Sequence, residues 1–201
     1  MYPYNFKMGQ IIQSDVPGVN PDRFSGAHIV IAAALASAAN NTGIRAAVVD
    51  TGVQQVVTTG ITQPSVPRNI TATAGGTATD IKAITVTITG TNHLDEVISE
   101  VLPAFTLDTA GTVTGNKAFK TVTSITVPAH DGVGATTAIG FGEKLGLPYK
   151  LPHNTVQDAY LNNVKEGTAP AVTVSTTAIE SNTIDLNSAL NGTIVDIYLF
   201  V

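Results

Sequence analysis

The sequence predicts a mainly β protein: a β-sandwich or barrel-like domain with an extended N-terminal arm and at most one short helix. Aliphatic and threonine side chains alternate in residues 84–90, a pattern that gives a strand one apolar face and one hydroxyl-bearing face. Segments of this kind are short and are separated by Gly, Pro and Asn breakers, which is typical of sandwiches and barrels. They share no fixed repeat length, which argues against a solenoid or a propeller.

The first 25 residues show no periodicity and are rich in aromatic residues and proline, including Tyr2, Pro3, Tyr4 and Phe6. This composition predicts an extended arm whose apolar side chains are available for docking. Two alternatives stay open for the arm. It docks on a neighbouring subunit, where it would contribute more to assembly than to folding, or it packs along its own domain.

Residues 24–40 carry conflicting signals. The alanines and Leu35 favour a helix that begins near Ser25 and ends near Asn40, whereas the β-branched residues 29–31 suit a strand. We predict a short helix here. Strands are then expected at Ala46–Val49, Gln54–Thr59, Asn69–Ala74, Ile81–Thr89, Glu96–Leu102, Lys117–Val127, Ala135–Phe141, Thr155–Leu161, Ala171–Ser175, Thr183–Leu186 and Thr193–Val201.

Two closely spaced prolines make Gln63–Pro67 the best linker candidate, because proline resists both helix and central strand. We therefore expect an N-terminal arm and short helix or strand region at 1–62, followed by a β-sandwich domain at 63–201. The last strand should be well paired, with Val195, Ile197 and Leu199 on its core face.

Composition limits the range of partners. Charged residues make up only 12% of the chain, whereas a typical soluble domain has about 25%. A surface with so few charges favours neutral subunit contacts, and we expect a homo-oligomer. The net charge is −5 and the basic residues are scattered, so no nucleic-acid partner is expected. The longest apolar stretch, residues 27–39, is too short to span a bilayer, so no membrane partner is expected either.

The reactive residues form no recognisable site. The chain has no cysteine, and none of its four histidines (His28, His93, His130 and His153) has the spacing of a helical metal site. The carboxylates Asp95, Glu96 and Glu100 fit a polar loop and an edge strand better than an acid–base pair or a calcium loop. We predict no catalytic, cofactor-binding or metal-binding residues, and hence no enzyme and no cofactor.

A glycine-rich segment, Gly140–Gly146, looks superficially like a phosphate-binding loop. Glu143 stands before Lys144 where that motif needs glycine, and Leu145 stands after it where the motif needs Ser or Thr. The glycines are expected to permit close backbone packing instead. The apolar residues 145–149 that follow are expected at a subunit contact.

Four segments together resemble structural proteins of tailed bacteriophage particles, of the kind found beside major capsid proteins. They are Val66–Gly76, Thr85–Asn92, Thr114–Val122 and Gly140–Pro148. The resemblance implies a virion component, such as a capsid decoration or cement protein. Val66–Thr71 also looks like the opening strand of fibronectin type III or Ig-like modules, although this chain lacks their core tryptophan.

The resulting hypothesis is a non-enzymatic virion protein that binds coat subunits and stabilises the capsid. Its expected partners are the major capsid protein or other virion subunits. Its expected location is the virion, after folding in the host cytoplasm. The alternative is a phage tail or surface adhesion module that binds a host glycan, although the chain has few aromatic residues for that role.

Overall fold

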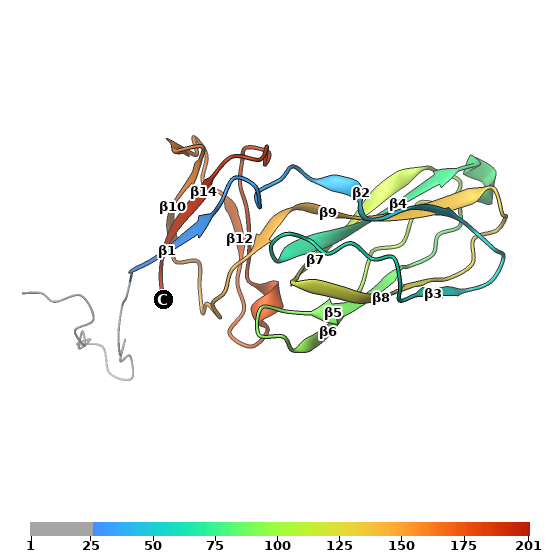
Figure 1. Ribbon diagram of the computed structural model, residues 1–201, viewed down its shortest axis with the longest axis horizontal. Helices are drawn as coiled ribbons and strands as arrows, with labels where there is room; N and C mark the ends of the chain where they lie inside the picture. The colour runs from blue at the N-terminus through green and yellow to red at the C-terminus, as the bar shows by residue number, and fades with distance from the viewer. Residues whose placement is uncertain (1–25) are drawn as a thin grey trace, which may run out of the picture.

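The computed structural model describes residues 26–201, and the arm expected at residues 1–25 lies outside this range. The mainly β prediction is confirmed, because the described residues form fourteen strands and only two short 3₁₀ turns, η1 (Ala78–Asp80) and η2 (Ile179–Ser181). The strands make three sheets. Two of them face each other in an elongated sandwich, and the third lies across one end of it (Figure 1).

The larger sandwich sheet is built around β9 (Ala135–Gly146), which pairs antiparallel with β4 (Arg68–Gly76) along one edge. Its other edge pairs first with β2 (Asn40–Val49) and then with β13 (Thr183–Asp185). The outer strands of this sheet are β7 (Gly111–Phe119) and β12 (Ala171–Thr173).

The second sandwich sheet has four strands in the order β3 (Gln55–Val57), β8 (Thr121–Val127), β5 (Thr87–Thr91) and β6 (Val97–Val101). Every second side chain points to the first sheet, as the alternating sequence predicts. Ile70 and Ile139 of one sheet and Ile88, Ile98 and Ile125 of the other share one buried core.

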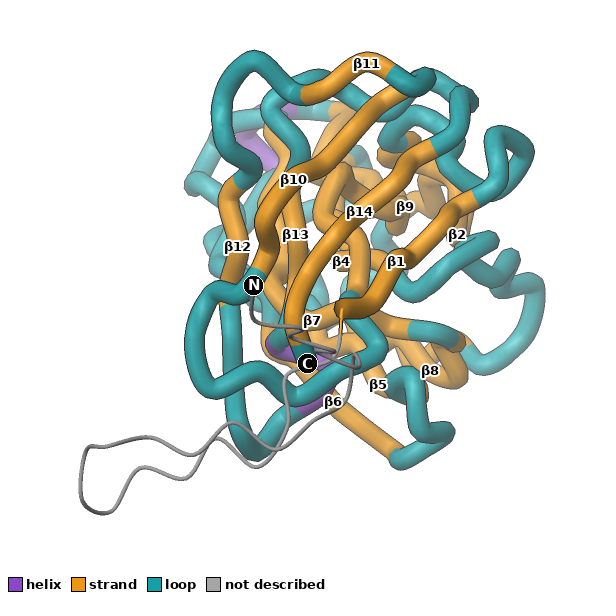
Figure 2. The backbone as a smooth tube through the Cα atoms, turned by 90° about the vertical axis from the view of Figure 1, so that its left-hand side faces the viewer, coloured by secondary structure: helices purple, strands orange, loops and turns teal. Residues whose placement is uncertain are grey.

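The third sheet, here called the end sheet, has the order β1 (Gly26–Ile31), β14 (Val195–Phe200), β10 (Val156–Leu161) and β11 (Val164–Lys165). Figure 2 shows its outer face toward the viewer. Its inner face covers a second core, to which β14 contributes Val195, Ile197 and Leu199. These three residues are buried, so the face predicted for the last strand is confirmed.

The short helix predicted within residues 24–40 is wrong. Gly26–Ile31 is a strand that pairs with β14, and a turn follows in which the amides of Leu35 and Ala36 donate to the carbonyl of Ala32. Residues 26–31 form a strand because each of them pairs with a residue of β14. This pairing outweighs the modest helix propensity of the alanines.

Several strand predictions had wrong bounds: β2 begins at Asn40 instead of Ala46, and β9 continues to Gly146 instead of ending at Phe141. Two further predictions differ more. The strand expected at Lys117–Val127 is divided at Lys120 between β7 and β8, which belong to different sheets. Of the strand expected at Ile81–Thr89, only the end is in β5; the earlier part follows residues 102–108 through isolated backbone hydrogen bonds while Ile81 and Ile84 stay buried. Burial alone produced the same apolar pattern as a strand.

The sheets cross the domain boundary expected near residue 62. Strands β1, β2 and β3 come from residues before that position, and they pair with β14, β9 and β8 from after it. The two cores are instead divided along β9, with Ile139 in the first core and Leu145 in the second.

Arg68 holds the junction between the cores, and its side chain is fully buried. One Nη donates to the carbonyl of Ser37 at 2.7 Å and the other donates to the carbonyl of Gly142. The guanidinium also lies 4.6 Å from the ring centroid of Phe141. These contacts tie the turn after β1 to β4 and β9.

Removal of the Arg68 side chain should therefore be costly. Arg68→Ala leaves a cavity and removes the donors from the buried carbonyl of Gly142 and the part-buried carbonyl of Ser37, so the free energy of unfolding should fall by about 3 kcal/mol or more. The matched control is Arg45→Ala, because Arg45 is partly exposed and donates only to the carbonyl of Thr59. That change should cost under about 1 kcal/mol. Urea unfolding of both variants tests this, and equal losses would contradict it.

The two faces of β14 give a second test. Ile197→Ala should lower the free energy of unfolding by about 2–5 kcal/mol, because the side chain is almost completely buried and its loss leaves a cavity. Asp196→Asn on the opposite face should cost under about 1 kcal/mol, since the amide oxygen can still accept from His28. A neutral Ile197→Ala in urea melts would show that this core is loosely packed.

Candidate functional site

The four histidines lie apart, and no group of residues within 26–201 has the geometry of a metal site. His130 is buried between the turn before β9 and η1. Its Nδ1 accepts from the backbone N–H of Lys82 at 3.1 Å, and its Nε2–H donates to Thr137 Oγ1 at 3.0 Å. In the neutral imidazole, both ring nitrogens are thus occupied by hydrogen bonds within the fold. These bonds give His130 a structural role.

Burial lowers the pKa of His130, and the nearby carboxylates of Asp50 and Asp131 oppose this effect only in part. Burial also lowers the pKa of His93, whose Nε2 lies 3.4 Å from the carbonyl oxygen of Gly146. His153 is exposed in the loop before β10. His28 is on the outer face of the end sheet and is described below.

The three carboxylates that the sequence singled out all organise loops and edges. Asp95 has a positive φ in the turn before β6 and pairs with Lys120 at 2.8 Å. Glu96 accepts from the Asn92 amide. Glu100 accepts from the backbone N–H groups of Asn116 and Lys117, while burial raises its pKa. Their partners are backbone atoms and neighbouring side chains, as expected for a polar loop and an edge strand.

The glycine-rich segment is part of β9, as a packing element. A Cβ at Gly140 would lie 2.0 Å from the carbonyl oxygen of Asn40, and a Cβ at Gly142 would lie 2.7 Å from the Asn69 amide. The prediction of close backbone packing is therefore confirmed. The subunit contact expected at residues 145–149 is wrong for Leu145 and Leu147, which are buried in the second core of their own chain.

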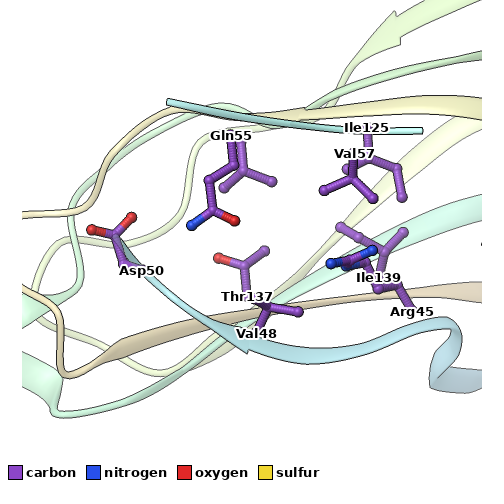
Figure 3. A pocket seen from close by; sticks show the side chains of 9 residues that line it. Arg45, Val48, Asp50, Gln55, Val57, Ile125, Thr137 and Ile139 are labelled. Carbon is purple, nitrogen blue, oxygen red and sulfur yellow. The ribbon is translucent and has the colours of Figure 1, made fainter. Parts of the chain in front are cut away.

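A small cavity lies between the sandwich sheets (Figure 3). Gln55 and Val57 extend into it from one side, and Thr137 and Ile139 extend into it from the other. Its volume is about 20 Å³, which is enough for a water molecule. Ligand pockets are typically about 300–1,000 Å³, so this cavity is a packing feature.

The first candidate surface is the outer face of the second sandwich sheet, here called the neutral face. Three valines at its edges are prominently exposed: Val97 by 79%, Val101 by 61% and Val56 by 59%. Threonines fill the middle, where Thr91 and Thr121 share a hydrogen bond of 2.7 Å between their hydroxyls. The outward-facing residues of β3, β5, β6 and β8 are Val56, Thr87, Thr89, Thr91, Val97, Ser99, Val101, Thr121, Thr123, Ser124 and Thr126.

None of these outward-facing residues is charged. The charged side chains nearest to them stay at the border of the sheet, where Asp95 pairs with Lys120 and Lys117 donates to the carbonyl of Ser99. A partner can cover a face of hydroxyls and methyls without burying an unpaired charge. The centre of a protein interface is likewise depleted of charged residues.

The second candidate surface is the outer face of the end sheet, here called the aromatic face. The rings of His28 and Tyr198 stack with centroids 4.3 Å apart and an interplanar angle of 6°. The ring of Tyr160 meets Tyr198 edge-on at 5.8 Å. His28 Nε2–H donates to Asp196 Oδ1 at 2.8 Å, which fixes the imidazole against the tyrosine. This cluster joins β1, β14 and β10.

Comparison of the chain with protein-family models, with curated proteins and with solved structures found no match. In the part of the chain that the structure describes, no helix has the length and apolar character needed to cross a membrane. The observations available for function are therefore the fold and the two exposed sheet faces.

The buried His130 predicts that the fold is sensitive to acid. Since its folded pKa lies below the ordinary value of about 6.5, the unfolded chain takes up a proton first as the pH falls. The free energy of unfolding should therefore drop as the pH falls through and below about 6.5, by at most about 1.4 kcal/mol per pH unit for this residue.

Urea melts at a series of pH values measure this effect. His130→Gln should give a flatter pH profile than the wild type, because one of the two histidines whose pKa is lowered by burial is gone and only His93 remains. His153→Gln is the matched control at an exposed position and should leave the profile unchanged. An unaltered profile in His130→Gln would contradict the assignment.

Proposed function

We propose that this protein is a non-enzymatic structural subunit of a tailed phage particle, which binds coat subunits and stabilises the capsid as a decoration, cement or minor head protein. The observation that carries the proposal is the neutral face. It combines three exposed valines with a field of threonines and has no charged side chain. This face supports the proposal of a neutral contact, which the low charge of the chain, 12%, led us to expect.

The fold suits a subunit whose contact surface has to be rigid. The neutral face is backed by Ile88, Ile98 and Ile125, which are buried in the sandwich core, so the surface is held by the main body of the protein. Its backbone groups are paired across four strands, and the side chains that a partner would meet are short. Short, β-branched side chains lose little conformational entropy when covered, which favours association.

The proposed partners are the major capsid protein or other virion subunits, and the proposed location is the virion. The resemblance of four sequence segments to phage structural proteins supports this choice of partner. The proposal assigns no substrate and no cofactor, since each reactive side chain singled out in the sequence has a structural partner or lies apart from the others.

Co-sedimentation with empty capsids of the phage that encodes the chain tests the proposal. The wild type should bind, and binding should persist in moderate salt because screening acts on ionic contacts. The double variant Val97→Lys/Val101→Lys should bind about tenfold more weakly or worse, since covering the face would bury unpaired ammonium groups. Lysine is tolerated at exposed sheet edges, so the variant should stay folded.

Val133→Lys is the matched control, because Val133 is 64% exposed but lies in the loop before β9. It should bind capsids like the wild type. Circular dichroism and urea melts establish that all three proteins are equally folded. A wild-type protein that ignores capsids at micromolar concentration would overturn the proposal, and equal binding by the wild type and the double variant would remove the neutral face from it.

A further inference from the structure

The aromatic face contains a groove with no role in the proposed function so far. It has a volume of about 330 Å³ and is lined by Gly26, Ala27, His28, Gln157, Tyr198, Leu199 and Phe200. Tyr198 is 41% exposed, although β14 is an interior strand of the end sheet. The groove is therefore built on paired strands.

The chemistry of this groove favours an aromatic, peptide-like occupant. Its polar lining side chains are His28, Gln157 and Tyr198 with its hydroxyl, and the His28 Nε2–H is already donated to Asp196. A sugar would bring several hydroxyls that need partners, and few are available here. A tyrosine or phenylalanine ring can instead pack on Tyr198 and gain from the ring-to-ring geometry that His28 and Tyr160 already show.

The chain itself supplies such an occupant. Residues 1–25 lie outside the described range, and their sequence begins Met1-Tyr2-Pro3-Tyr4-Asn5-Phe6, with three aromatic rings in five positions. The segment joins the described structure at Gly26, which lines the groove and is paired with Phe200. Its 25 residues can reach at most about 90 Å when extended, so distance does not restrict it to its own subunit.

We infer that the groove binds the N-terminal segment of a second copy of this chain. When two copies face each other through their end sheets, each segment starts at the edge of one groove and is long enough to reach the other. Two-fold symmetry then makes both exchanges equivalent. Tyr2, Tyr4 and Phe6 are the contact residues toward Tyr198.

This inference rests on the proposed function for the presence of neighbouring copies, and it assigns the homo-oligomer contact to a defined surface. Asp196 positions the site: its carboxylate accepts from His28 and is only 14% exposed. The His28 ring is thereby held parallel to Tyr198 before any partner arrives. Such pre-organisation lowers the entropy cost of docking.

Sedimentation velocity over a wide micromolar range tests the contact on full-length chains. The wild type should dimerise. The variants Tyr198→Ser and Tyr2→Ser/Tyr4→Ser/Phe6→Ser should each weaken the dimer about tenfold or more, as expected for aromatic anchors. The controls are Asn5→Ser/Gln10→Ser in the segment and Val164→Ser on the end sheet, and both should dimerise normally.

A synthetic peptide of residues 1–12 identifies the groove directly. Added to the full-length Tyr2→Ser/Tyr4→Ser/Phe6→Ser protein, it should bind and shift the NMR resonances of the His28 and Tyr198 rings. The peptide should not bind to a protein that carries the Tyr198→Ser substitution together with Tyr2→Ser/Tyr4→Ser/Phe6→Ser. Absence of binding would overturn the inference. So would a wild type that stays monomeric while the peptide binds, since the segment would then occupy its own groove.

A glycan array tests the remaining alternative, which is that the groove binds a sugar. Glycan binding that disappears in Tyr198→Ser would overturn the inference and make the groove a sugar site. Capsid co-sedimentation keeps the two proposals distinct. Loss of the dimer in Tyr198→Ser with capsid binding intact supports the groove assignment alone, whereas peptide binding without capsid binding would overturn the proposed function alone.

Discussion

The structure depends on one strand that serves two cores. β9 pairs with β4 along one edge and with β2 and then β13 along the other, so its two ends belong to different parts of the molecule. Its side chains are also divided between two cores, with Ile139 in the sandwich core and Leu145 in the core below the end sheet. The glycines of β9 let neighbouring backbone and amide groups approach more closely than a Cβ would permit. The cores are coupled because they share this strand.

The buried polar groups stabilise this arrangement mainly through backbone partners. Arg68 donates to two carbonyls at the junction of the cores. Asn182 does similar work near β13: its Oδ1 accepts from the amides of Leu151 and Ser175, and its Nδ2 donates to the carbonyls of Ser175 and Ala178. A buried polar side chain costs free energy unless it is hydrogen-bonded. Hydrogen bonds to particular backbone atoms form only when the loop has one particular conformation. These residues therefore specify the loops as well as stabilise them.

The two exposed faces show how a charge-poor protein can divide its contacts. The neutral face presents short side chains on four paired strands, which suits a broad contact with a rigid surface. The aromatic face presents fixed rings beside a groove, which suits a narrow contact with an extended segment. The two faces belong to different sheets, so each can be altered without change to the other. In the two proposals above, the neutral face contacts the capsid and the aromatic face contacts a second copy of the chain.

The sequence by itself determined the properties that alternate locally: the mainly β class, most strand positions, the buried side of β14 and the threonine-rich, charge-poor character of the neutral face. Each follows from the two-residue period of a strand, which needs no distant partner to be recognised. Only the tertiary structure decided what depends on pairing between remote segments. Residues 26–31 became a strand because β14 lies beside them, and His28 meets Asp196 across 168 positions of the chain. No local pattern encodes such an encounter, so the aromatic face and the shared role of β9 emerged only when the sheets were assembled.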